Sequence, residues 1–262
     1  GQDLLSAVSL ASQVTFVYNL FLAAMSIGTS IFAAQYWGKG DRESVEKILA
    51  IVLRISVTVS VIFFLAASLC PGVLMRIFTP DAVLIGYGRE YLQIVGITYL
   101  LCGVSQIYLC IMKNSDLASK SMVIASSAAF LNIVLNAVFI YGLFGAPRLE
   151  IAGAAVATAI SRIVEFVWIL IEHSKKERIK IRIAYIVRPD TVLRKDFWRY
   201  TLPVLGNELV WGGGFTMYSV IMGHLGTDAV AANSIANIVK NLIASLALGI
   251  GNGGSILVGN EL

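Results

Sequence analysis

The stretch from residue 172 to residue 199, EHSKKERIKIRIAYIVRPDTVLRKDFWR, carries nine Lys or Arg residues. It is the only long segment of the chain that cannot lie in a hydrocarbon environment, because charged side chains are costly inside a bilayer. Apolar segments long enough to cross a membrane lie on both sides of it. This stretch, called the basic island below, therefore divides the chain into two hydrophobic blocks.

The composition indicates a membrane protein. Of the 262 residues, 57% are hydrophobic and 14% are charged, whereas a soluble domain carries about 25% charged residues. Lipid can solvate this apolar surface over several segments of about 20 residues each. The net charge of +4 comes from basic residues in the gaps between apolar runs. We therefore expect a multi-pass protein of the plasma (inner) membrane, with the bilayer and no nucleic acid as its partner.

The order of apolar runs and polar turns predicts an all-α, polytopic helical bundle. Residues 75–90 mix apolar and charged side chains and are interpreted as an interfacial amphipathic stretch, with Thr79-Pro80-Asp81 as a helix-start signal. Seven membrane spans are expected, at residues 4–37, 48–69, 91–112, 121–143, 151–171, 200–222 and 229–258.

The distribution of basic residues predicts the orientation of the bundle. Connectors on one side, including the basic island, hold fourteen Lys or Arg residues, whereas connectors on the opposite side hold three. Cytoplasmic loops carry the excess of Lys and Arg. The island is therefore expected in the cytoplasm and Gly1 outside.

An internal repeat emerges when each residue n is compared with residue n + 225. Residues 1–3, GQD, fall on residues 226–228, GTD, and residues 28–31, GTSI, fall on residues 253–256, GGSI. Both copies run inward from the outside, so the repeat is parallel; chance similarity between two Ala- and Ser-rich helices is the alternative. The repeat predicts two pseudo-symmetric lobes, residues 1–172 and 200–262, joined by a linker at residues 173–199. With one helix expected before Gly1 and four after Leu262, the second lobe would be incomplete in this sequence.

Several motifs together resemble the multidrug and toxic compound extrusion (MATE) transporters. They are residues 35–41, QYWGKGD, after Gly28; residues 132–136, NIVLN; residues 153–162, GAAVATAISR; Leu202-Pro203; and residues 226–228, GTD. The resemblance implies two six-helix lobes around a central cavity, of which this chain would hold helices two to eight. It also implies exchange of Na⁺ or H⁺ for amphipathic, often cationic, small molecules, without a cofactor.

Glu208 is the sharpest candidate for a functional residue in the second lobe. An ionisable group within a span is a functional candidate by default, and Glu208 lies about eight residues into its span. We expect it to bind a proton, Na⁺ or a cationic substrate, with Asn207 beside it and Trp211 offering a ring face to a cation. The alternative is a structural ion pair with Lys240 in the next helix.

In the first lobe, Asn132 and Asn136 are one helical turn apart and therefore share a face. Their amide oxygens would coordinate a cation or connect two helices. The resemblance implies the first role, because some family members use an Asn at the first position, an acid at the second and a Thr on the next helix. Asn132 and Thr158 match that pattern, whereas Asn136 replaces the acid, so the coupling ion stays open.

Two other observations limit the function. Arg162 and Glu165 lie three residues apart near mid-span and are expected to form a structural pair. Cys70, Cys102 and Cys110 lack a Cys-x-x-Cys spacing or a His neighbour, so neither a metal site nor a catalytic residue is predicted.

A monomeric exporter of drugs and toxins is favoured. A flippase for a lipid-linked precursor is the alternative, and an intramembrane enzyme is less favoured because no catalytic set occurs at one depth.

Overall fold

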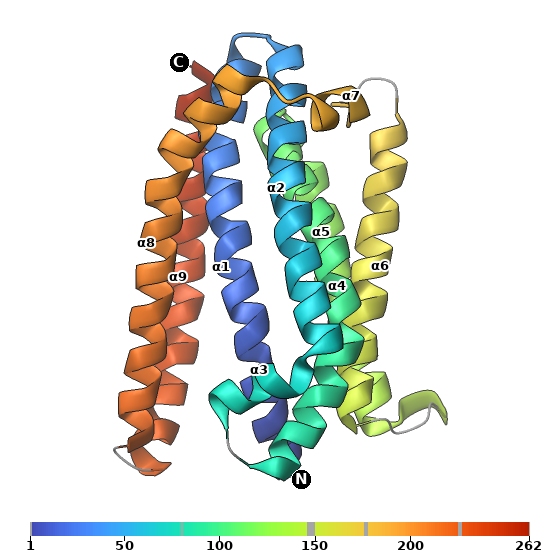
Figure 1. The fold of residues 1–262 in the computed structure, drawn as a ribbon, viewed down its shortest axis with the longest axis vertical. Helices are drawn as coiled ribbons and strands as arrows, with labels where there is room; N and C mark the ends of the chain where they lie inside the picture. The colour runs from blue at the N-terminus through green and yellow to red at the C-terminus, as the bar shows by residue number, and fades with distance from the viewer. Residues whose placement is uncertain (1, 80, 146–149, 176–177, 225–226, 262) are drawn as a thin grey trace.

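The computed structural model describes residues 2–79, 81–145, 150–175, 178–224 and 227–261. Within these ranges the chain is helical and contains no strand, which confirms the all-α prediction. Long helices run side by side as a bundle (Figure 1). The elements are α1 (Gln2–Gly38), α2 (Arg42–Leu69), α3 (Pro71–Phe78), α4 (Ala82–Asn114), α5 (Ala118–Tyr141), the 3-10 turn η1 (Leu143–Gly145), α6 (Glu150–Ser174), α7 (Ile183–Val187), α8 (Thr191–His224) and α9 (Thr227–Glu261).

Six segments of the described helices are long and apolar enough to cross a membrane. A helix rises about 1.5 Å per residue, so about 20 residues cross the hydrocarbon core. The remaining predicted span, residues 200–222, lies within α8. The chain is therefore a multi-pass membrane protein. The six segments are Ala7–Gly38, Arg42–Leu69, Ala82–Asn114, Ala118–Tyr141, Ala152–Ser174 and Ile243–Glu261.

The stretch predicted as interfacial at residues 75–90 is divided between two helices. The short helix α3 ends at Phe78, and α4 begins at Ala82. The Asp81 carboxylate accepts hydrogen bonds from the backbone N–H groups of Val83 and Leu84, at 2.8 and 3.4 Å, so it caps α4 as the helix-start signal predicted. Nothing breaks the helix after this cap. Residues 82–90 are therefore the first turns of a long helix and not a separate interfacial segment.

The basic island also contributes to helices at both of its ends. α6 continues to Ser174, and α8 begins at Thr191, where Asp190 accepts hydrogen bonds from two backbone N–H groups. Phe197 in the first turns of α8 is buried and packs near Phe32 of α1, with 6.1 Å between the ring centroids. An apolar contact of this kind stabilises helix in a stretch that its charges alone mark as a connector.

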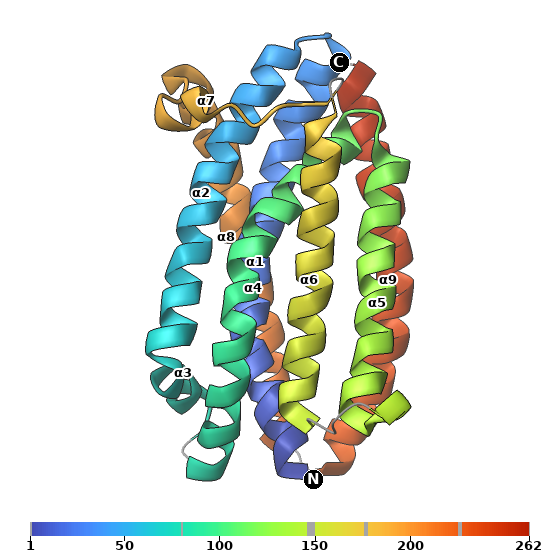
Figure 2. The same cartoon turned by 90° about the vertical axis from the view of Figure 1, so that its right-hand side faces the viewer.

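α4 lies at the centre of the bundle. It packs against α1, α2 and α6, and α6 lies between α4 and α5 (Figure 2). α2 and α4 approach closely at Gly103, whose carbonyl accepts a hydrogen bond of 2.7 Å from the Ser56 hydroxyl. A methyl group at Gly103 would overlap the Ser60 hydroxyl. The absence of a side chain at this glycine therefore sets the distance between the two helices.

α1 and α9 run in the same direction (Figure 1), as a parallel repeat requires. The two helices begin at Gln2 and Thr227, which are separated by the repeat offset of 225 residues. They touch near their ends, where a methyl group on Gly259 would come within 2.8 Å of the Ala34 side chain. In addition, Gly38 lies directly against the backbone carbonyl of Asn260.

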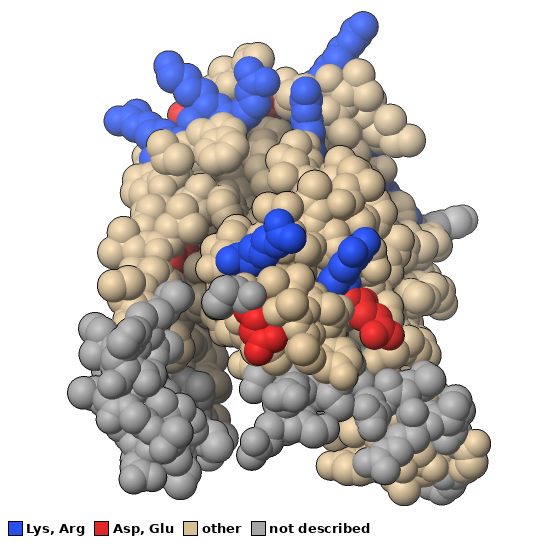
Figure 3. All heavy atoms as spheres, turned by 60° about the horizontal axis from the view of Figure 1, so that its bottom comes forward, with Lys and Arg blue, Asp and Glu red and all other residues tan. Residues whose placement is uncertain are grey.

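The charges are unevenly distributed between the two ends of the bundle. Figure 1 places the basic island, α7 and the last turn of α9 at one end of the bundle, and Figure 3 shows blue Lys and Arg side chains along that end. Figure 3 is turned so that the opposite end comes forward, and only a few charged side chains are visible there. This distribution is the one from which the sequence predicts a cytoplasmic position for the island's end.

Candidate functional site

A cavity of about 290 Å³ lies among α1, α4 and α6. Its wall includes Thr15 and Asn19 from α1, Tyr99 from α4, and Thr158 and Arg162 from α6. Thr15 and Asn19 are four residues apart, as are Thr158 and Arg162, so each pair occupies one helix face. The local spacing on each helix therefore aims polar groups into a space enclosed by otherwise apolar spans.

Two tyrosines build a rigid part of this wall. The Tyr18 hydroxyl donates to the backbone carbonyl of Tyr99 at 2.7 Å and lies 2.8 Å from the Ser60 hydroxyl. The Tyr99 hydroxyl lies 3.0 Å from the Thr15 hydroxyl, and the two tyrosine rings are 4.8 Å apart between centroids. Buried hydroxyls with partners are stable in an apolar surrounding. The wall thus combines aromatic surface with fixed hydrogen-bonding groups.

Arg162 brings a positive charge to the cavity, and Glu165 balances it. The Arg162 guanidinium donates to the Glu165 carboxylate at 2.7 Å, which confirms the expected pairing. The Gln106 amide also reaches the same carboxylate at 3.4 Å. The Glu165 side chain is only 2% exposed, whereas that of Arg162 is 37% exposed. The pair therefore presents a guanidinium to the cavity without a net charge.

The structure brings the predicted residues Asn132, Asn136 and Thr158 together. The Asn136 amide donates to the Asn132 side-chain oxygen at 3.1 Å, and the Asn132 amide donates to the Thr158 hydroxyl at 3.4 Å. These contacts connect α5 to α6, which is the second of the two roles expected for Asn132 and Asn136, the first being coordination of a cation. Because Thr158 also lines the cavity, the same three residues form a polar cluster that reaches the cavity wall.

The predicted residues of α8 and α9 are arranged differently. Glu208 is half-buried, and the neighbouring Asn207 and Trp211 are exposed. Within the described residues Glu208 forms no ion pair with Lys240. The Lys240 ammonium instead lies 4.6 Å from the centroid of the Phe215 ring, which stacks on Trp211 at 5.7 Å. The contact between Lys240 and Phe215 was not predicted from the sequence, and the expected role of Trp211 as a ring for a bound cation stays a prediction.

Sequence reasoning also missed the tyrosine wall. The available signal was a polar stripe on the first apolar span, where Ser12, Thr15 and Asn19 recur at intervals of three and four residues. Such spacing marks one helix face. It indicates that this face meets protein or water and not lipid tails.

With this geometry established, the fold defines a multi-pass helical membrane protein with a cavity between its spans. The MatE family model matches residues 1–138 and 203–262. The chain belongs to the MatE family. The two matched segments are separated by residues 139–202, a range that contains α6 and the basic island.

Curated relatives extend along nearly the whole chain. A probable multidrug resistance protein NorM of Thermotoga maritima is 27% identical over 97% of the chain. The multidrug resistance protein NorM of Vibrio parahaemolyticus is 26% identical over 98% of it. The chain spans 55% and 57% of the lengths of these two relatives.

Solved structures show the same fold. The chain is similar throughout to an outward-facing multidrug resistance MATE family transporter of the MOP superfamily, with a TM-score of 0.86, 22% identity and 58% of that protein covered. A MOP superfamily transporter from Pyrococcus furiosus, described as having a binding pocket of reverse polarity that suggests a different function, matches with a TM-score of 0.83 and 23% identity. This match extends over the whole chain and over 58% of the Pyrococcus furiosus transporter.

Proposed function

We propose that the protein is a secondary active transporter that exports amphipathic or cationic small molecules in exchange for Na⁺ or H⁺ by alternating access. Its membership of the MatE family and the multidrug resistance proteins among its relatives support this proposal. The relatives are transporters, so the intramembrane-enzyme alternative gains nothing from them.

The cavity among α1, α4 and α6 is the observation that carries the proposal. Its volume of about 290 Å³ is near the lower end of small-molecule sites, which are mostly apolar with a few placed polar groups. The rings of Tyr18 and Tyr99 provide apolar area, and their hydroxyls and Thr15 provide polar contacts. Glu165 offsets much of the charge of Arg162, so this pair repels a cation in the cavity less than an unpaired arginine would.

Two groups of residues are proposed to couple transport to an ion. Asn132, Asn136 and Thr158 present oxygens within a small volume beside the cavity. Hard cations such as Na⁺ prefer oxygen ligands. Glu208 on α8, with Asn207 and Trp211 beside it, provides a carboxylate that takes up a proton or a cation. Lys240, held at Phe215, leaves this carboxylate without its predicted ion-pair partner among the described residues.

The proposal is tested by efflux of a cationic dye from vesicles containing the full-length protein, driven separately by Na⁺ and proton gradients. Glu208→Gln removes the charge and is expected to abolish ion-coupled efflux without lowering expression. Glu90→Gln, at an exposed position of α4, is the matched control and should leave efflux unchanged. Full transport by Glu208→Gln would exclude the proposed role of Glu208, and no efflux under either gradient would exclude ion-coupled export of this dye.

A flippase for a lipid-linked precursor remains the second candidate. Arg162 is the observation in its favour, because a guanidinium facing a cavity binds phosphate. A phosphate-bearing substrate favours several unpaired cations, whereas Arg162 is paired with Glu165. Addition of a lipid-linked phosphate compound to the dye assay distinguishes the two. Inhibition that Arg162→Gln relieves would favour the flippase.

A further inference from the structure

Part of the basic island crosses the cytoplasmic ends of the first-lobe helices. We call residues 178–187 the linker strap; it includes α7, which lies beside the end of α2 (Figure 1). The buried Glu46 carboxylate accepts the backbone N–H of Lys180 at 3.1 Å and the Arg182 guanidinium at 2.5 Å. The Tyr108 hydroxyl donates to the Ile179 carbonyl at 3.1 Å. The strap is therefore fixed to α2 and α4.

Two adjoining cavities lie beneath this strap. The larger, about 410 Å³, is lined by Trp37, Arg42, Ser115, Leu117, Arg178 and Ile179. The smaller, about 330 Å³, shares Arg42, Arg178 and Ile179 with it and adds two acidic residues, Glu43 and Glu46. We call the larger one the arginine cavity, because its two charged lining residues are both arginines.

The acidic groups near the arginine cavity already have partners. Glu46 binds Lys180 and Arg182, and Glu43 binds Lys47 at 2.9 Å. The Asp116 carboxylate accepts a hydrogen bond of 2.9 Å from the Trp37 indole. The Glu172 carboxylate is shared between Lys175 and Arg178, so it only partly balances Arg178. Arg42, without an ion pair among the described residues, and the part of Arg178 that Glu172 does not contact therefore bring positive charge to this space.

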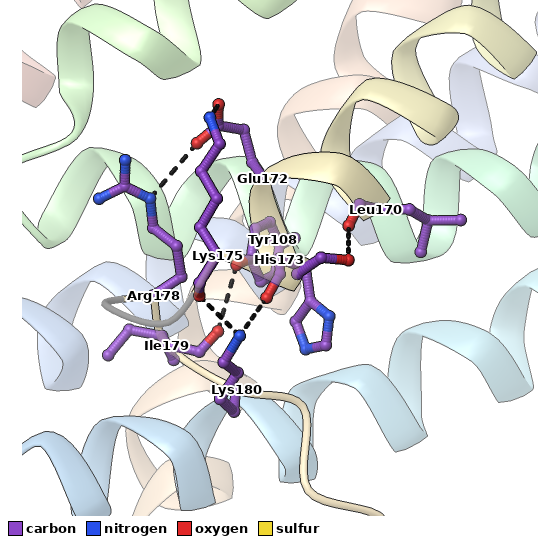
Figure 4. A network of polar contacts seen from close by, with 9 residues as sticks. Tyr108, Leu170, Glu172, His173, Lys175, Arg178, Ile179 and Lys180 are labelled. Atoms are coloured by element: carbon purple, nitrogen blue, oxygen red, sulfur yellow. Dashed lines mark hydrogen bonds and ion pairs between the residues drawn. The ribbon is translucent and has the colours of Figure 1, made fainter.

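The Arg178 guanidinium contacts Glu172 through its Nε nitrogen alone. Its Nε lies 3.3 Å from the Glu172 carboxylate, and Figure 4 shows its two terminal nitrogens pointing away from Glu172. The Arg178 side chain is 13% exposed, and its single contact with an acidic side chain among the described residues is the one from Nε to Glu172. A ligand with several acceptor oxygens would satisfy these donors.

Arg42 is positioned by an aromatic ring and not by an acid. Its guanidinium carbon lies 5.2 Å from the centroid of the Trp37 ring. Among the described residues it forms no ion pair. A guanidinium stacked in this way keeps its donor edge available for an anion.

We propose that Arg42 and Arg178 bind the phosphate group of an anionic ligand in the arginine cavity. A guanidinium fork matches phosphate oxygens in two parallel hydrogen bonds. Basic pockets between transmembrane helices on the cytoplasmic side suit anionic lipid head groups, and Trp37, Leu117 and Ile179 provide apolar wall for the adjoining part of the ligand. Because one arginine belongs to α2 and the other to the strap, the phosphate ties the strap to the first lobe.

The ligand chemistry is shared by an anionic phospholipid and by free phosphate, and the test separates these sources. The thermal unfolding midpoint of the full-length protein in detergent is measured with phosphatidylglycerol, phosphatidylcholine or inorganic phosphate added. If only phosphatidylglycerol raises the unfolding midpoint, the ligand of the site is an anionic lipid. An equal rise with inorganic phosphate assigns it to a soluble phosphate. No rise with either anion overturns the proposal.

Matched variants locate the effect. Arg42→Gln and Arg178→Gln are each expected to weaken binding of the anion about tenfold or more, since charge-assisted contacts are lost. Arg188→Gln removes the same charge from the island at a residue that lines neither cavity, and should bind as the unchanged protein does. Arg42→Lys keeps the charge but loses the fork, so it provides an intermediate case if a Gln variant folds poorly. Equal loss in Arg188→Gln, or full binding by Arg42→Gln and Arg178→Gln, overturns the assignment to this cavity.

Discussion

α4 and α9 have similar lengths and opposite surroundings. In the most apolar part of α4, 61% of the residues are buried within the protein, whereas the share in α9 is 6%. α4 contacts α1, α2 and α6, while α9 packs mainly on α1 and α8 and leaves apolar residues such as Ile250 exposed. The position of α4 is thus determined by protein contacts. Most of the described surface of α9 needs lipid tails or further protein to cover it.

The difference extends to the polar groups of the two regions. Around α4, Tyr99 and Glu165 have partners within hydrogen-bond distance. On α8 and α9, Glu208 lacks an ion pair in the described structure, and Lys240 contacts an aromatic ring. Paired charges suit a fixed scaffold, whereas an unpaired carboxylate suits a group that exchanges an ion. Three stability measurements test this contrast between the two regions.

The largest effect is expected for the buried ion pair. Glu165→Leu leaves Arg162 without its counter-charge and should lower the free energy of unfolding by about 3 kcal/mol, the lower end of the range for one partner of a buried pair, because the Arg162 side chain is 37% exposed. The double change Arg162→Met with Glu165→Leu should restore most of it. Glu208→Leu should cost much less. Denaturant unfolding in detergent measures all three, and a similar loss for Glu165→Leu and Glu208→Leu would remove the contrast.

An intermediate effect is expected at two glycines. Gly103→Ala places a methyl group against the Ser60 hydroxyl and should lower the free energy of unfolding by about 1–3 kcal/mol through overpacking. Gly213→Ala on α8 meets no atom within 4 Å, so it should be neutral or stabilising by up to about 1 kcal/mol through helix propensity. Thermal unfolding of the two variants compares them directly. Equal destabilisation would show that α8 is as tightly packed as α4.

The smallest effect is expected at two helix starts. Asp41 caps α2 through the Ser44 backbone N–H at 3.0 Å, and Asp190 caps α8. Replacing either by Ala should cost about 1 kcal/mol. A smaller loss for Asp190→Ala than for Asp41→Ala would indicate that the first turn of α8 contributes less to cooperative unfolding.

The Asp41 cap also predicts a pH dependence. Hydrogen bonds from the Ser44 hydroxyl and backbone N–H lower the pKa of Asp41 below its ordinary value. Its stabilising contribution is therefore complete above the unfolded pKa of about 3.9 and is lost as the pH falls through the lower folded value. Unfolding midpoints measured between neutral and strongly acidic pH should show less acid sensitivity in Asp41→Asn, which keeps a capping oxygen without the carboxylate.

Local spacing explains what the sequence predicted well. The contact between Asn132 and Asn136 follows from a separation of four residues, and the Arg162–Glu165 pair follows from a separation of three. The Asp81 cap likewise depends only on its immediate neighbours. In each case the helix itself determines the geometry, so knowledge of the neighbouring helices is unnecessary.

Contacts between segments that are far apart in the chain could not be predicted from the sequence. The hydroxyls of Thr15 and Tyr99 meet across 84 residues, and Glu46 meets Arg182 across 136. Such contacts depend on how each helix is rotated about its own axis, and in the membrane this rotation is set by packing against neighbours. Span positions could therefore be predicted more accurately than the cavity they enclose.

The contact between Ala34 and Gly259 has a geometric consequence. These residues are 225 positions apart, so they occupy equivalent places in the two copies of the repeat. Two points related by a twofold rotation are separated by twice their distance from the rotation axis. On the predicted repeat, the pseudo-twofold axis would pass between these two residues, because a methyl group on Gly259 would lie 2.8 Å from Ala34. When one half rotates relative to the other about a line through this point, displacement is smallest at Ala34 and grows with distance from it.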